Sequence, residues 1–444
     1  MAARSLDVRE TLTAAVRSLR EAVHRSMEMF HAVNRRRFLT AAAGGLLATL
    51  PARRVWPVQA TSLRRGLGAV GPRWRPTAEL LHTLPRLLEL AAVPGLALAT
   101  ADDGGIVSKA SGRACLQPPR GAGDDTVFEA ASLGKPLFAY AVLKLVDAGV
   151  LDLDRPLHDY FASPEADTPR MRRVTARHVL THTSGLPNWR HEPGPLAPAT
   201  EPGETYAYSG EAFFYLQRVV ERVTGRPIAR LLREEVLQPL GMTESSWVWR
   251  DDFDARMAVG YDESGNTAEV YAAIGRRTAV IAQEWRKPIE EWRYEDAARV
   301  VPLVNPAWPI LPVYMVPNVA ASLLTTARDY ARFLAHLVAR SAVATGTSPG
   351  ALALRPATLE AMMTPQVRIN SALAWGLGWG LQEDEYGRTL WQWGANNGFR
   401  NFTVADPSNG RAIVVLTNSG NGPRVYERVV VALTGHDHPA FLRA

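Results

Sequence analysis

Cysteine is almost absent from this chain of 444 residues, which contains a single one, Cys115. One cysteine excludes an intramolecular disulfide and a metal site built from cysteine thiolates. Long apolar runs are absent as well, and a membrane-spanning helix needs roughly 20 consecutive apolar residues. With 47% apolar and 21% charged residues, the composition is that of a folded globular protein.

The body of the chain has no excess of positive charge, although the net charge of the whole is +6. Residues 1–60 contain ten arginines and four acidic residues, which leaves 40 basic residues (50 − 10) and 40 acidic residues (44 − 4) for the remainder. A nucleic-acid-binding protein concentrates positive charge on its folded domain. We therefore expect no nucleic-acid partner.

The basic segment 1–60 also carries an export pattern. Three arginines at 35–37 precede a short apolar, small-residue stretch at 38–50, which is typical of a twin-arginine signal. Residues 58–60, Val-Gln-Ala, are a plausible cleavage site. We expect an exported protein, periplasmic or secreted, with no stable membrane anchor. A basic segment followed by a helix of small residues is the alternative.

Strand patterns lie at both ends of the remaining chain, residues 61–444. Residues 93–114 predict a hairpin with an Asp-Gly turn, and residues 390–418 alternate well enough for two or three antiparallel strands. Helical patterns dominate from about 155 to 330. The predicted fold is α+β, with one antiparallel sheet built from both chain termini, flanked by helices, and a mostly helical subdomain inserted.

One part of that helical interval has weak periodicity. Residues 262–317 are rich in tryptophan and proline. We interpret them as a long irregular excursion that could wall a pocket.

A serine lies three residues before a lysine at the start of an apolar helix pattern, in "FEAASLGKPLFAYAVLKLVDAG". Pro136 favours a first helical turn, so the helix should begin near Ser132 and end at Gly149. Lys135 then lies one turn below Ser132 in apolar surroundings, where burial would lower its pKa and suit it to act as a base. Alternatively, Ser132 only caps the helix and Lys135 extends to solvent.

Two further segments could contribute to the same chemistry. Tyr208 lies at a predicted loop-to-helix junction, and a tyrosine beside a charged lysine would have a lowered pKa and could shuttle a proton. Gly394 on a predicted strand would allow a close approach. The N–H of Ala395 could then pair with that of Ser132 as an oxyanion hole. Taken alone, a packing tyrosine and a strand bulge are the ordinary alternatives.

In this order and spacing, the three segments resemble the serine β-lactamase and penicillin-binding protein superfamily, most closely its class C β-lactamase, D-alanyl-D-alanine peptidase and esterase branch. Further segments are similar to that family at "VPGLALATADDGG", "LTHTSGLP", "PLGMTES", "ASLLTTARDYARFL", "WGLGW" and "VVLTN". The resemblance covers roughly residues 80–435. It implies a β-lactamase/transpeptidase-like fold with no metal or organic cofactor.

The resemblance also implies roles for individual residues. Ser132 would be the acylated nucleophile, Lys135 its activating base and Tyr208 the proton shuttle to the leaving group. The N–H groups of Ser132 and Ala395 would bind the oxyanion. The substrate would be a small molecule or a peptide that carries an acyl group.

Two positions depart from the family pattern. The second motif usually ends in asparagine, where this chain has Gly210, and the third commonly starts with lysine or histidine, where this chain has Gln392, followed by Trp393 and Gly394. Without that charge, binding of a substrate carboxylate weakens, although Arg400 could supply it.

These departures favour some substrates over others. An esterase or broad acyl hydrolase is therefore the first expectation, with a D-amino-acid peptidase and a β-lactamase behind it. A non-catalytic penicillin-binding-type sensor is the alternative from a different class. Three histidines, His178, His182 and His191, are too irregularly placed to indicate a metal site.

Overall fold

The computed structural model describes residues 74–339 and 354–443. The export signal expected within residues 1–60 lies outside the described residues.

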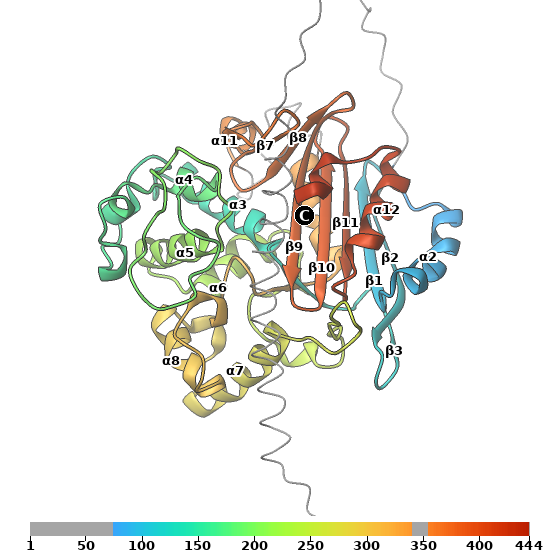
Figure 1. Cartoon of the computed structure of the whole chain (residues 1–444), viewed down its shortest axis with the longest axis horizontal. Coiled ribbons are helices and arrows are strands. Elements are labelled where there is room, and N and C mark those ends of the chain that lie inside the picture. The colour runs from blue at the N-terminus through green and yellow to red at the C-terminus, as the bar shows by residue number, and fades with distance from the viewer. Residues whose placement is uncertain (1–73, 340–353, 444) are drawn as a thin grey trace, which may run out of the picture. The chain divides into compact units, whose positions relative to one another are not determined.

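Strands from both ends of the chain form one sheet (Figure 1). Its order is β3-β2-β1-β11-β10-β9-β8-β7-β6, and every neighbouring pair is antiparallel. The strands are β1 (Gly95–Asp102), β2 (Gly105–Cys115), β3 (Arg120–Gly121), β6 (Val367–Arg368), β7 (Leu373–Trp375), β8 (Gly380–Asp384), β9 (Gly387–Asn396), β10 (Phe399–Asp406) and β11 (Arg411–Thr417). The β1–β11 pairing joins the two ends of the chain, which confirms the predicted sheet.

Helices cover both faces of this sheet, as Figure 1 shows. Two of them, α2 (Ala78–Ala91) and α12 (Pro423–Thr434), pack on one face, and α9 (Ala327–Val338) packs on the other. Strand β1 is buried along almost its whole length. Its leucines, Leu96 and Leu98, belong to the core cluster with α2 and α12, and the alternating alanines face the other way.

The central helix α3 (Gly134–Asp147) follows a short strand, β4 (Phe128–Ala131), which pairs with β5 (Leu323–Thr325). Helix α3 begins two residues after Ser132, with Pro136 in its first turn, as the sequence predicted. Its first ten residues are all buried. A helix that is apolar on every side belongs inside the molecule, and α3 lies between the sheet and the helical region.

The regular elements of the interval 155–330 are mainly helices, joined by long irregular segments such as residues 181–209. These are α4 (Ala176–Leu180), α5 (Gly210–Thr224), α6 (Ile228–Leu232), α7 (Tyr271–Trp285) and α8 (Tyr294–Val304), and α11 (Pro356–Met362) follows later in the chain. Strand β5 lies near the end of the interval.

The expected irregular excursion at 262–317 is wrong, because α7 and α8 lie within it. Small residues hide the periodicity of α7: Gly275 is buried in its inner stripe, and a Cβ there would lie 2.9 Å from the ring of Trp249. The buried face of α7 therefore includes a glycine that packs against the Trp249 indole, and a pattern of hydrophobic residues alone does not reveal it.

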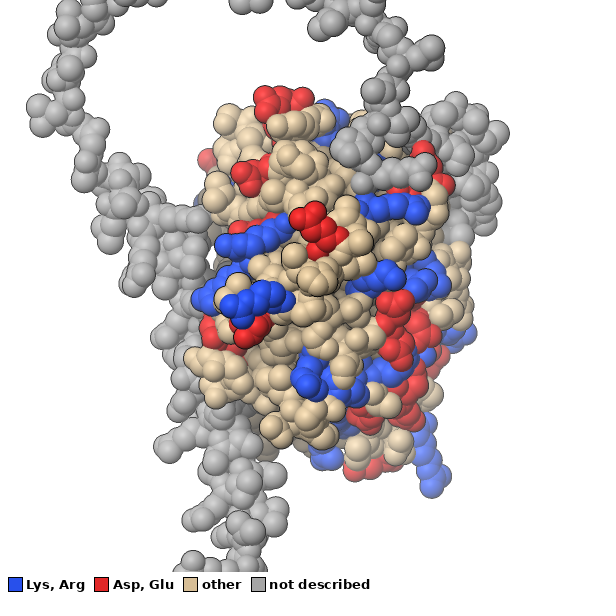
Figure 2. Space-filling view, turned by 90° about the vertical axis from the view of Figure 1, so that its right-hand side faces the viewer, with Lys and Arg blue, Asp and Glu red and all other residues tan. Residues whose placement is uncertain are grey.

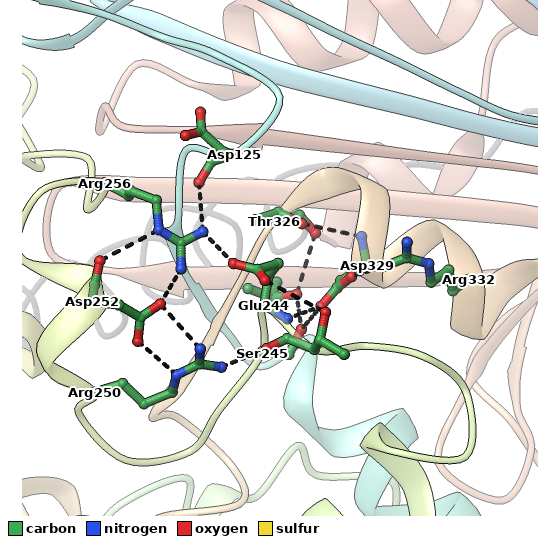
Figure 3. A network of polar contacts seen from close by, with 11 residues as sticks. Asp125, Glu244, Ser245, Arg250, Asp252, Arg256, Thr326, Asp329 and Arg332 are labelled. Atoms are coloured by element: carbon green, nitrogen blue, oxygen red, sulfur yellow. Dashed lines mark hydrogen bonds and ion pairs between the residues drawn. The ribbon is translucent and has the colours of Figure 1, made fainter.

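A buried carboxylate in α9 anchors the loop that follows α6 (Figure 3). Asp329 accepts hydrogen bonds from the Glu244 N–H (2.7 Å) and from the Ser245 Oγ (2.9 Å). Arg256 bridges Glu244 and Asp252 from the outside. These contacts fix the loop that leads back to β4 through the hydrogen bond from the Val127 N–H to the Arg256 carbonyl.

The surface carries charges of both signs. Figure 2 shows lysine and arginine side chains interspersed with acidic ones on the face it presents. Ion pairs also occur elsewhere on the described surface, as between Arg177 and Asp154, which lie 2.6 Å apart. Within residues 74–339 and 354–443, none of the helices has the length and apolar character needed to cross a bilayer.

Candidate active site

The hydroxyl of Ser132 lies between two polar partners at the end of β4. Lys135 Nζ donates to Ser132 Oγ (2.9 Å) and to the carbonyl of Ala320 (2.8 Å), which is also 3.3 Å from Ser132 Oγ. Ala131, just before the serine, has a φ of 54°, a left-handed conformation that is rare for residues other than glycine. The turn from β4 into α3 therefore presents the serine to the lysine.

Lys135 is buried, with 1% of its surface exposed. Helix α3 has no side-chain cap, so the alternative of a capping Ser132 and a solvent-seeking lysine is wrong. Desolvation holds the pKa of Lys135 well below its ordinary value. The amine is therefore suited to accept the proton of the serine hydroxyl.

Tyr208 differs from the expectation based on a charged lysine. Burial raises the pKa of its phenol, and hydrogen bonds with Ser132 and Gln392 offset only part of that effect. Lys135 Nζ lies over the face of the ring, 4.9 Å from its centroid. The expected lowering of the Tyr208 pKa is wrong, because burial acts against the charged forms of both groups. The tyrosine stays a neutral phenol.

His182 fixes the Tyr208 loop, a role that sequence reasoning missed. Its Nδ1 accepts the N–H of Ser209 (3.0 Å), and its carbonyl accepts the N–H of Ala207 (2.7 Å). The imidazole lies 4.2 Å from the Tyr208 ring, centroid to centroid. Burial, together with the nearby Lys135, holds the pKa of His182 far below its ordinary value. The "LTHTSGLP" segment thus supplies a neutral packing partner.

The sequence indicated no metal site at the three histidines, and His178 and His182 have partners within the protein. His182 is buried in the core, and His178 lies in α4, where its Nδ1 accepts the N–H of Thr175 (3.2 Å). Among the residues that the structure describes, no three histidine, cysteine or acidic side chains gather as metal ligands would.

Strand β9 brings Gln392 and Gly394 to the serine. A Cβ on Gly394 would lie 2.1 Å from the Ala130 carbonyl, so only glycine permits this approach to β4. Ala395 follows directly. Gln392 is fully buried, and its Nε2 contacts the carbonyls of Ser132 (3.3 Å) and Trp393 (3.0 Å).

The same Gln392 nitrogen lies 3.2 Å from the Tyr208 hydroxyl. A nitrogen that faces two carbonyls must be the NH₂ group, so it donates to Tyr208. The phenolic proton is thereby left for Ser132. Trp393 covers the tyrosine from the side, with ring centroids 4.7 Å apart. Gln392 is therefore engaged with the tyrosine and two carbonyls.

The place of the asparagine missing at Gly210 is filled by a tryptophan. A Cβ on Gly210 would lie 2.4 Å from Cζ2 of Trp189. The Asn188 side chain accepts the N–H of Gly210 (2.9 Å), and Asn188 also accepts the N–H of Glu211 through its carbonyl. Residues 188–189 thus cap the start of α5, and the glycine makes room for the indole.

Arg400 is held away from Ser132. Its guanidinium donates to the carbonyls of Asn396 and Phe399 and lies 3.6 Å from a carboxylate oxygen of Glu263. In β10, Arg400 shares a face with Phe402, which packs in the α2–α12 cluster. The structure therefore brings together Ser132, Lys135, Tyr208 and the Gln392–Ala395 segment, but not the Arg400 guanidinium.

The chain belongs to the beta-lactamase family, since the Beta-lactamase family model matches residues 83–436. Penicillin-binding protein 4 of Amycolatopsis lactamdurans is 27% identical over 355 residues, which cover 74% of this chain and 81% of that protein.

Two shorter matches carry other activities in their names. Esterase EstB of Burkholderia gladioli is 34% identical over 187 residues, covering 35% of this chain and 46% of the esterase. The D-alanyl-D-alanine-carboxypeptidase/endopeptidase AmpH of Escherichia coli K12 is 31% identical over 174 residues, covering 34% of this chain and 44% of AmpH. Each of these matches spans less than half of the relative.

Solved structures share the fold. A class C beta-lactamase superposes with a TM-score of 0.63 at 19% identity, covering 80% of this chain and 94% of that one. The D-alanine carboxypeptidase AmpC of Burkholderia cenocepacia gives a TM-score of 0.62 at 19% identity, covering 80% and 97%. The fold is the β-lactamase/transpeptidase-like fold, as the sequence resemblance implied, and the family is one of serine hydrolases.

Proposed function

We propose that this protein is an exported serine hydrolase that forms an acyl-enzyme on Ser132, with esters or a broad range of acyl compounds as substrates. The observation that carries the proposal is the buried Lys135 amine, 2.9 Å from Ser132 Oγ. Burial lowers the pKa of Lys135, so its amine gives up its proton more readily and can serve as the base.

Acylation begins at Ser132. Its Oγ attacks the substrate carbonyl carbon while the Oγ proton passes to the neutral amine of Lys135. The ammonium formed there is stabilised by the Ala320 carbonyl, which already accepts from Nζ at 2.8 Å. A buried charge is costly without such an acceptor.

The tetrahedral intermediate needs donors for its oxyanion and a proton for its leaving group. In this proposal the N–H groups of Ser132 and Ala395 bind the oxyanion. The neutral phenol of Tyr208 gives its proton to the departing oxygen and regains one from the Lys135 ammonium. Water then attacks the acyl-enzyme, with the same groups working in reverse.

The surroundings of the site support an uncharged ester as the preferred substrate. Gln392 is buried and donates to Tyr208, and the Arg400 guanidinium is bound to carbonyls and lies near Glu263. Neither is placed to bind a substrate carboxylate. Gly210 offers no side chain to an acyl amide. An ester also needs less activation of its leaving group than an amide does.

The test compares wild type with Ser132→Ala on p-nitrophenyl acetate, a D-Ala-D-Ala peptide and nitrocefin, together with fluorophosphonate labelling. We expect labelling and ester hydrolysis in wild type, and a loss of roughly 10⁴-fold or more in the variant. Equal labelling of both proteins would refute the acyl-enzyme on Ser132.

The second candidate function is that of a D-amino-acid peptidase or β-lactamase. The names of AmpH and of the class C structures support it. Turnover of the D-Ala-D-Ala peptide or of nitrocefin at least tenfold faster than that of esters would favour it. Ligand binding without turnover of any substrate would instead indicate a non-catalytic sensor.

Export is part of the proposal and rests on the arginine triplet at 35–37. Replacing Arg35 and Arg36 by lysine should retain the protein in the cytoplasm of a host with a twin-arginine pathway. Unchanged periplasmic yield in cell fractionation would contradict a twin-arginine route.

A further inference from the structure

The side chains of Glu129 and Asn396 form a hydrogen bond next to the site, and each also bonds a backbone group. Glu129 lies in β4, three residues before Ser132, and is completely buried. Its Oε1 accepts the N–H of Ala272 (2.8 Å), and its Oε2 accepts Nδ2 of Asn396 (2.9 Å). This pair could not be predicted from short sequence patterns, because its members are 267 residues apart.

The amide of Asn396 joins a third segment to the pair. Its Nδ2 also donates to the carbonyl of Ala321 (3.1 Å). Both acceptors require the NH₂ group on that side, so the orientation of the amide is fixed. Asn396 is the last residue of β9, and it directly follows Ala395.

Each of the three joined segments carries an atom that the proposed reaction uses. Strand β4 leads into Ser132, and β9 carries the Ala395 N–H. The segment before β5 carries the Ala320 carbonyl, which binds both Lys135 Nζ and Ser132 Oγ. A shift of Asn396 or Glu129 would therefore change the spacing between nucleophile, base and oxyanion donor.

Burying a carboxylate costs desolvation free energy unless hydrogen bonds or a charged partner compensate it. Burial raises the pKa of Glu129 to about 7, while hydrogen bonds at the start of α7 and with Asn396 act in the opposite direction. Both partners of the carboxylate are donors, so each needs an acceptor oxygen, and the two oxygens of Glu129 supply one to each. An amide would set its own NH₂ against one of them.

Resting on the proposed function, we propose that Glu129 and Asn396 are positioning residues for acyl transfer. Their hydrogen bonds hold the Ala395 N–H and the Ala320 carbonyl in place around Ser132. They touch neither the substrate nor the reacting atoms.

The test uses Asn396→Ala in the full-length protein, with p-nitrophenyl acetate hydrolysis and the rate of fluorophosphonate labelling as readouts. Asn396 is half-buried at a strand end, so its truncation should leave the fold intact. We expect kcat and the labelling rate to fall by about 10- to 100-fold, because small displacements of reacting groups are costly. KM should change less than about threefold, since substrate contacts remain.

The matched control is Asn421→Ala. Asn421 is an asparagine more buried than Asn396, and its amide nitrogen likewise bonds a backbone carbonyl, that of Glu263 (3.0 Å), away from Ser132. We expect its kcat per folded molecule to stay within about twofold of wild type. An equal fall of kcat in both variants would show a general effect of stability and overturn the positioning role.

A double-mutant cycle with Glu129→Gln completes the test. Because the two residues act as one unit, Glu129→Gln with Asn396→Ala should be no slower than about twice the slower single variant. Multiplicative losses, or an Asn396→Ala variant labelled at the wild-type rate, would overturn the proposal. Absence of labelling in wild type would instead refute the proposed function.

Discussion

The two halves of the candidate site differ in how they are built. On the nucleophile side, Ser132 and Lys135 stand one helical turn apart in the chain and match the family pattern, with the Ala320 carbonyl as their shared partner. On the opposite side, Gly210 and Gln392 depart from it. Gly210 packs against the Trp189 ring, and Gln392 donates a hydrogen bond to the Tyr208 hydroxyl.

This difference indicates which residues of the site depend on a local segment and which depend on distant ones. The serine and its base belong to one local segment, α3 and the turn before it, whereas their shared partner Ala320 comes from a distant segment. The opposite wall is assembled from distant loops, and its polar groups can be replaced by packing contacts. The residues proposed for acyl transfer thus match the family pattern on one side, while those proposed for substrate recognition depart from it on the other.

The largest predicted effect lies on the nucleophile side. Lys135→Ala should lower kcat by roughly 10³- to 10⁴-fold, since it removes the base. In wild type, activity should rise with pH through the pKa of Lys135, which burial places well below the ordinary lysine value. Rate profiles between pH 6 and 10 measure both.

Lys135→Arg is the control for charge, because arginine stays protonated throughout that range. It should be as inactive as the alanine variant. Substantial activity in Lys135→Arg would show that a positive charge, and not a neutral base, is needed beside Ser132.

The next effect concerns the buried carboxylate on the same side. The pKa of Glu129 is raised by burial from 4.5 to about 7, so its ionised form is less favourable in the folded state than in the unfolded one. As pH rises from about 4.5 to 7, this group should remove about 3 kcal/mol of stability. Glu269 acts on it in the same sense.

Urea unfolding of wild type and Glu129→Gln at pH 5 and pH 8 measures this effect. Glutamine does not titrate, so the stability difference should shift in favour of the variant by up to about 3 kcal/mol between these pH values. A difference that does not change with pH would mean that Glu129 keeps an ordinary pKa.

On the opposite side, Gly210→Ala should destabilise the fold by about 1–3 kcal/mol, because the new Cβ would lie 2.4 Å from the Trp189 ring. Adding Trp189→Ala should recover most of that loss. Gly194→Ala is the control, since a Cβ there meets no atom within 4 Å. Equal melting temperatures of the Gly210 and Gly194 variants would contradict the close packing.

The smallest effect is expected at Arg400. Arg400→Lys should change kcat/KM by less than about threefold for a neutral ester and for its carboxylate-bearing analogue alike, because the guanidinium is occupied by carbonyls near Glu263. A tenfold loss confined to the anionic substrate would show that Arg400 binds its carboxylate. The side opposite Ser132 would then retain a charged group for substrate recognition.

Local signals made much of the fold predictable. Pro136 marked the first turn of α3, and the Asp-Gly turn marked the β1–β2 hairpin. Helix α7 was missed because its buried stripe contains Gly275, which is buried against Trp249 and adds nothing to hydrophobic periodicity. The position of helix α7 therefore depends on a contact with a distant segment, which composition does not indicate.

The site divides in the same way. Ser132 and Lys135 could be paired from sequence because they stand three positions apart at the start of a predicted helix. The Ala320 carbonyl lies 185 residues from Lys135 and is a backbone atom, so no residue type marks it. The protonation of Tyr208 was predicted wrongly because it depends on burial, which no short segment contains.

By itself the sequence determined the family, the sheet built from both chain ends and the Ser132–Lys135 pair, since these follow from turn residues, periodicity and short spacings. Only the tertiary structure decided the partners of that pair. Desolvation, the Trp189 indole at Gly210 and the Glu129–Asn396 hydrogen bonds arise when distant segments meet, because burial and hydrogen-bond geometry are properties of the assembled fold.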